Sequence, residues 1–239
     1  MSRRAAGFTA IREVLPWLLA PPFFFLLALA GASVLAGLSG ARDPEAVTAA
    51  VEGSLPQVLL VVQLGMLGLV LLVLRRGGWR ALGWKPLRPG RATVEIAVGV
   101  AAGAALGLLY PVGLEPLHLF LQRTFGDYVP PGGVQAAFGP GAAVFFAANV
   151  LLAPFAEESL YRGFALERLQ MRLAPGTAVG LSAVFFGLLH WAGGFWYMVL
   201  TGGVLGTLFG AFFLWRGSVL APFFAHLTLN LLEFAYLAL

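Results

Sequence analysis

The stretch Ala156-Glu157-Glu158-Ser159-Leu160-Tyr161-Arg162-Gly163 places two carboxylates and a guanidinium directly after the largely apolar residues 142–155. An ionisable side chain in hydrocarbon costs from about 2.5 to more than 10 kcal/mol, so these groups need partners. Glu158 and Arg162 are four residues apart, and on a helix they share a face and are expected to pair. Glu157 lies about 100° round the same helix, so it must face a different group.

The composition is that of an integral membrane protein. The chain has 239 residues, of which 59% are hydrophobic and 11% charged, and its mean hydropathy is +0.87. Soluble domains carry about 25% charged residues. We therefore expect an all-α fold, a polytopic transmembrane helical bundle that forms a single domain over residues 1–239. With no cysteine in the sequence, disulfides and thiolate chemistry are excluded.

Seven membrane spans are expected, with eight as the alternative count. Their order is 14–38, 55–74, 92–110, 142–172, 177–191, 195–215 and 219–239. The loop after the second span, residues 75–91, carries six basic residues and no acidic one. Basic loops are typical of the cytoplasmic side, which predicts a cytoplasmic N-terminus. We expect a multi-pass protein of a bacterial inner or plasma membrane, in contact with the bilayer and not with nucleic acid.

Two glycine stripes indicate where helices pack closely. Gly99, Gly103 and Gly107 recur at four-residue spacing in the third expected span, and Gly202, Gly206 and Gly210 do so in the sixth. Small residues at this spacing let membrane helices approach each other.

Polar residues outside the glycine stripes indicate loops and positions at the membrane interface. Arg42, Asp43, Glu45 and Glu52 indicate a polar, net acidic external loop. Residues 112–140 are the least regular segment, and a loop of this length is often functional, although no motif in it supports a substrate gate. Glu95 is expected to reach the membrane interface and needs no function to explain it.

The second half of the chain holds further polar residues on apolar segments. His190 follows Phe186 by four residues, and Asn230 follows His226 by four, so each pair shares a helix face. Taken singly, each is explained by packing or by interhelical hydrogen bonding. Together with Glu157 they predict a functional site, because ionisable groups within a membrane usually mark one.

These motifs resemble those of a known family. Glu157-Glu158-x-x-x-Arg162, Phe186-x-x-x-His190 and His226-x-x-x-Asn230 are similar, in order and spacing, to the three motifs of the type II CAAX prenyl endopeptidase-like family, also called CPBP or Abi intramembrane proteases. The resemblance covers residues 140–239, the expected catalytic half. It implies an intramembrane endopeptidase acting on a membrane-associated peptide or protein, with lipidated substrates included in that class.

The resemblance also implies roles for the catalytic residues. Glu157 would be the general base that activates a water, and His190 would help to hold that water. His226 and Asn230 would stabilise the oxyanion of the tetrahedral intermediate, with Glu158, Arg162 and Phe186 in support. Amide hydrolysis needs such a base and such donors.

Three alternatives stay open at this point. Glu157, His190 and His226 would make a zinc site of two histidines and a glutamate, although the His-Glu-x-x-His signature is absent. We favour the metal-free reaction with no cofactor. The other two alternatives are a non-catalytic peptide-binding or immunity protein and, less favoured, a transporter, for which no paired repeats are found.

Overall fold

The computed structural model describes residues 3–129 and 141–237, and within these ranges all regular structure is helical. The prediction of an all-α polytopic bundle is confirmed. Among the described residues, five helices are long and apolar enough to cross a membrane: Gly7–Leu38, Leu55–Gly77, Pro89–Phe125, Ala142–Gln170 and Phe195–Arg216. Two further helices, α9 (Pro175–Leu189) and α12 (Leu220–Leu237), fall where the remaining spans were expected.

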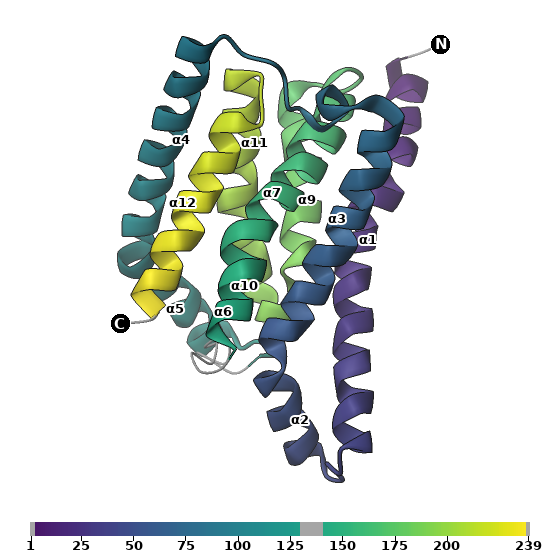
Figure 1. Ribbon diagram of the computed structural model, residues 1–239, viewed down its shortest axis with the longest axis vertical. Helices are drawn as coiled ribbons and strands as arrows, with labels where there is room; N and C mark the ends of the chain where they lie inside the picture. The colour runs from purple at the N-terminus through teal and green to yellow at the C-terminus, as the bar shows by residue number, and fades with distance from the viewer. Residues whose placement is uncertain (1–2, 130–140, 238–239) are drawn as a thin grey trace.

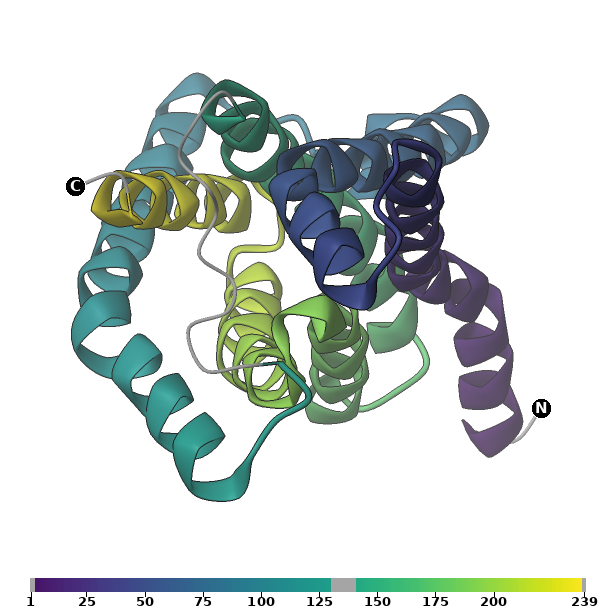
Figure 2. The same cartoon turned by 90° about the horizontal axis from the view of Figure 1, so that it is seen from below.

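The helices form one bundle with the central helix, which bears the paired glutamates, in its middle (Figure 1). Helix α1 (Arg3–Leu38) and α3 (Leu55–Gly77) lie at one side, and α4 (Pro89–Leu109) and α12 lie at the other (Figure 1). Figure 2 shows the same separation along the bundle, with α9, α10 (Phe195–Leu200) and α11 (Thr207–Arg216) between the two sides.

Both glycine stripes lie at helix contacts, as the sequence predicted. A Cβ atom added at Gly103 would lie 2.2 Å from the carbonyl oxygen of Ala225, and one at Gly99 would lie 2.5 Å from that of Ala221. The first stripe therefore holds α4 against α12. A Cβ at Gly202 would lie 2.8 Å from the carbonyl oxygen of Ala183, so the second stripe packs on α9.

The central helix runs from Ala142 to Gln170 without a break, close to the expected single helix over 142–172. It alternates between α and π geometry, through α6 (Ala142–Phe145), a π stretch (Phe146–Leu152), α7 (Ala153–Glu157), a second π stretch (Glu158–Leu166) and α8 (Glu167–Gln170). Such π turns are frequent at functional sites. Every residue of the second π stretch is buried.

One local expectation was wrong. The polar loop expected before the second span contains a helix, α2 (Pro44–Gly53), because the Asp43 side chain accepts a 2.8 Å hydrogen bond from the Ala46 N–H and Pro44 begins the helix. Glu95, expected at the membrane interface, is 1% exposed, and both its oxygens accept hydrogen bonds from Arg216 at 2.8 Å.

The irregular segment expected over 112–140 contains α5 (Glu115–Phe125), while residues 130–140 lie outside the described ranges. Asp127, just after α5, connects this segment to the start of α10 by hydrogen bonds. Its carboxylate accepts hydrogen bonds from the backbone N–H groups of Phe195 at 2.7 Å and Trp196 at 3.2 Å. Burial raises the pKa of Asp127, but these hydrogen bonds outweigh it, so the pKa is lowered overall.

Candidate active site

The centre of the site is the buried Glu158 carboxylate. Its Oε1 lies 3.1 Å from Arg162 Nη1, one helical turn along, as the four-residue spacing predicted. The same oxygen lies 3.0 Å from Nδ1 of His226 on α12. Glu158 and Arg162 are both 0% exposed and His226 is 5% exposed, so water screens this cluster very little.

Arg162 is held from several directions besides this ion pair. Its guanidinium carbon lies 4.1 Å from the ring centroid of Phe186 and 5.5 Å from that of Phe209. Its Nη2 donates to the carbonyl oxygen of Gly206 at 3.4 Å. A cation over an aromatic face in a desolvated site is stabilised by about 2 kcal/mol. The structure thus places Phe186 beside Arg162, where it supports the cation.

Glu157 faces a different set of groups from its neighbour. Its Oε1 accepts a 3.2 Å hydrogen bond from Gln63 Nε2 on α3, and its Oε2 lies 4.0 Å from His226 Nε2. Oε2 is buried and has no hydrogen-bond partner among the described residues. A buried carboxylate oxygen of this kind is an acceptor for a water molecule.

The two ring nitrogens of His226 face different glutamates. Nδ1 faces the Glu158 carboxylate, which accepts, so Nδ1 carries a proton. Nε2 faces Glu157 at 4.0 Å, and it donates only when the ring is an imidazolium. In that state the two carboxylates are balanced by two cations, Arg162 and His226, which is the condition for burying charge.

The ring of Phe186 lies between those of His190 and His226 and contacts both. The ring centroids of His190 and Phe186 are 4.9 Å apart, and Phe186 in turn lies 6.1 Å from the ring of His226. His190 Nδ1 donates to the Phe186 carbonyl oxygen at 2.8 Å. In the neutral ring this leaves Nε2 as a hydrogen-bond acceptor.

Asn230 is 6% exposed and lies one turn after His226 on α12. Its Nδ2 donates to the carbonyl oxygen of Asn149 at 2.8 Å, across the interface with the central helix. An amide nitrogen has two hydrogens, so one N–H is used to orient the side chain and the second remains to donate.

Two groups at this site were not found from the sequence. Gln63, which is buried, lies in the second expected span, where an amide among apolar residues was the available signal. Asn149 contributes a backbone oxygen, which no side-chain pattern reveals. Within residues 3–129 and 141–237, no three His, Asp or Glu side chains are grouped as a metal site.

The fold and these contacts define an integral membrane protein with a buried cluster of two glutamates, an arginine and a histidine. Residues 139–232 match the sequence model of the type II CAAX prenyl endopeptidase Rce1-like family. The match implies an intramembrane endopeptidase. Comparisons with curated proteins and with solved structures gave no match.

Proposed function

We propose that the protein hydrolyses a peptide bond of a membrane-associated substrate with a water activated by Glu157, without a metal. The observation that carries this proposal is the difference between the two adjacent glutamates. Glu158 Oε1 forms an ion pair with Arg162 and a hydrogen bond with His226, whereas Oε1 of Glu157 accepts only from the neutral amide of Gln63. Oε2 of each carboxylate is buried with no hydrogen-bond partner in the described chain. Glu157, which has no arginine as counter-ion, is the carboxylate available to take a proton.

The reaction begins with a water bound at Glu157 Oε2. Glu157 removes one proton from this water as the water oxygen attacks the scissile carbonyl carbon, while the water's other O–H stays intact and donates a hydrogen bond to His190 Nε2. The proton on Glu157 then passes to the leaving amine, which breaks the C–N bond and restores the carboxylate. General-base catalysis of this kind contributes typically ~10²–10⁴-fold.

The oxyanion of the tetrahedral intermediate is stabilised from α12. His226 as an imidazolium donates through Nε2, and Glu158 supports this state by accepting from Nδ1 at 3.0 Å. The second N–H of Asn230 donates from one helical turn along. Arg162 holds Glu158 in place and balances its charge.

The test uses purified protein in lipid bilayers and a peptide library with lipidated and unlipidated members. The informative variant is Glu157→Gln, which keeps the side-chain shape and removes the base. Its matched control is Glu167→Gln on the same long helix, where the carboxylate pairs with Lys85 at 2.9 Å.

We expect cleavage by the wild type and by Glu167→Gln, and a loss of ~10²-fold or more in Glu157→Gln. Binding of a library peptide by all three proteins with no cleavage would favour the non-catalytic peptide-binding alternative. Full activity of Glu157→Gln would end the proposed mechanism.

A further inference from the structure

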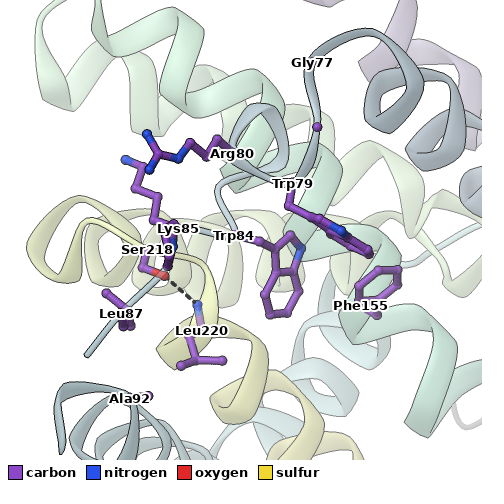
Figure 3. A pocket seen from close by; sticks show the side chains of 12 residues that line it. Gly77, Trp79, Arg80, Trp84, Lys85, Leu87, Ala92, Phe155, Ser218 and Leu220 are labelled. Atoms are coloured by element: carbon purple, nitrogen blue, oxygen red, sulfur yellow. Dashed lines mark hydrogen bonds between the residues drawn. The ribbon is translucent and has the colours of Figure 1, made fainter. Parts of the chain in front are cut away.

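A pocket of about 810 Å³ lies where α3 ends, apart from the catalytic cluster. Trp79, Trp84 and Phe155 form its aromatic wall, and Arg80 and Lys85 extend toward its other end (Figure 3). The volume is within the range of small-molecule sites, about 300–1,000 Å³. The proposed reaction uses none of these five side chains.

The aromatic wall is fixed in place by its own contacts. The Trp84 indole N–H donates to Ser159 Oγ at 2.9 Å, and its ring lies 5.5 Å from that of Phe155 and 5.4 Å from that of Phe223. Ser159 is 0% exposed, so the bond to Trp84 is shielded from water. The pocket is therefore preformed and does not depend on a ligand to order it.

The charge of the pocket is positive. Its lining includes Arg80 and Lys85 but no acidic residue. Lys85 is paired with Glu167 at 2.9 Å, outside the lining. Arg80 is exposed, and in the described part of the chain its guanidinium makes no ion pair or hydrogen bond. Arg80 is thus the cation free to bind an anion, and a guanidinium suits a phosphate group in particular.

The position of the pocket matches the headgroup region of a bilayer. The apolar helix α3 ends at Gly77 directly after Arg75 and Arg76, and Gly77 itself lines the pocket. Tryptophans at this level are typical of the membrane interface. One side of the pocket therefore adjoins acyl chains, while the other meets phosphate groups.

From this combination we propose that the pocket binds one anionic phospholipid, with its phosphate on Arg80 and an acyl chain along Trp79, Trp84 and Phe155. A free phosphate would leave the aromatic wall uncovered. A peptide would need hydrogen-bond partners for its backbone polar groups. The lining has one hydroxyl, that of Ser218, and it already accepts from the Leu220 N–H at 3.3 Å (Figure 3). A lipid therefore fits the pocket better than a peptide. The proposal holds whether or not Glu157 is the catalytic base.

The experiment measures quenching of tryptophan fluorescence in detergent micelles by phosphatidylglycerol brominated on its acyl chains. Brominated phosphatidylcholine provides the neutral-headgroup comparison. The variant is Arg80→Gln, and its matched control is Arg88→Gln, an exposed arginine of the same loop that does not line the pocket. A thermal melt checks that both variants are folded.

We expect saturable quenching by the anionic lipid at a lower mole fraction than by the neutral lipid. Arg80→Gln should weaken anionic-lipid binding about fivefold and Arg88→Gln less than twofold. Equal quenching by the two lipids, or equal weakening in the two variants, would overturn the proposal. Displacement of the bound lipid by inorganic phosphate or by an acidic peptide at equal concentration would overturn it too.

Discussion

Glu157 and Glu158 are adjacent and chemically identical, yet the structure predicts that replacement by glutamine destabilises the fold at Glu158 and leaves it stable at Glu157. Glu158 forms an ion pair with Arg162 and a hydrogen bond with His226, and Glu158 and Arg162 are both 0% exposed. Glu157 accepts a single hydrogen bond, from Gln63 at 3.2 Å. Glu158→Gln should therefore lose folding stability, whereas Glu157→Gln should lose activity alone.

The size of each effect follows from what is left behind. Glu158→Gln leaves the Arg162 guanidinium buried without its counter-ion, and breaking a buried ion pair in this way costs about 3–5 kcal/mol. For a protein of this length that lowers the melting temperature on the order of 10 °C. In Glu157→Gln the new amide oxygen can still accept from Gln63, so the free energy of unfolding should change by less than about 1 kcal/mol.

The assay is unfolding of each purified variant in mixed micelles, followed by circular dichroism, with cleavage measured on the same samples. The predicted pattern is a destabilised and inactive Glu158→Gln beside a stable and inactive Glu157→Gln. The reasoning is refuted if Glu157→Gln is destabilised as much as Glu158→Gln, or if Glu158→Gln melts like the wild type.

Three further predictions concern the oxyanion donor, the helix contacts and the α10 junction. Asn230→Ala should lower kcat by ~10²–10³-fold with the fold retained, measured on the cleaved peptide; a change in KM alone would contradict this role. Gly103→Ala should cost about 1–3 kcal/mol of folding stability, since its Cβ would lie 2.2 Å from a carbonyl oxygen of α12. The control Gly180→Ala, whose Cβ would have nothing within 4 Å, should not destabilise the protein. Equal melting temperatures of the two variants would contradict the close packing of α4 on α12. Hydrogen bonds lower the pKa of Asp127 below its ordinary 3.8, so its stabilisation of α10 is present above pH 3.8 and is lost as the pH falls through the lowered pKa. In the wild type, the protection factor of the Phe195 amide against hydrogen exchange should fall over that acidic range. In Asp127→Asn it should be low at every pH. An unchanged protection factor in the variant would refute the proposed role of the Asp127–Phe195 hydrogen bond.

Much of the bundle follows from the sequence because its signals are local. Spans are set by apolar length, and helix contacts by the spacing of small residues such as Gly103 and Gly202. The Glu158–Arg162 pair was predicted for the same reason, since four residues along one helix fix which side chains meet.

The rest of the site depends on contacts between distant segments. Gln63 reaches Glu157 across 94 residues of sequence, and His226 reaches Glu158 across 68. No periodicity specifies such pairs. The burial of Glu95 is of the same kind, because its partner Arg216 lies 121 residues away. The π geometry of Glu158–Leu166 also has no local sequence signal that we could read.

The central claim is that Glu157 activates water without help from a metal. It is tested most directly by the single-turnover cleavage rate of wild type and Glu157→Gln after exhaustive treatment with a strong chelator. The account predicts an unchanged rate for the treated wild type and a rate at least ~10²-fold lower for the variant. A wild type that loses activity on chelation and regains it with Zn²⁺, or a variant as fast as the wild type, would contradict it.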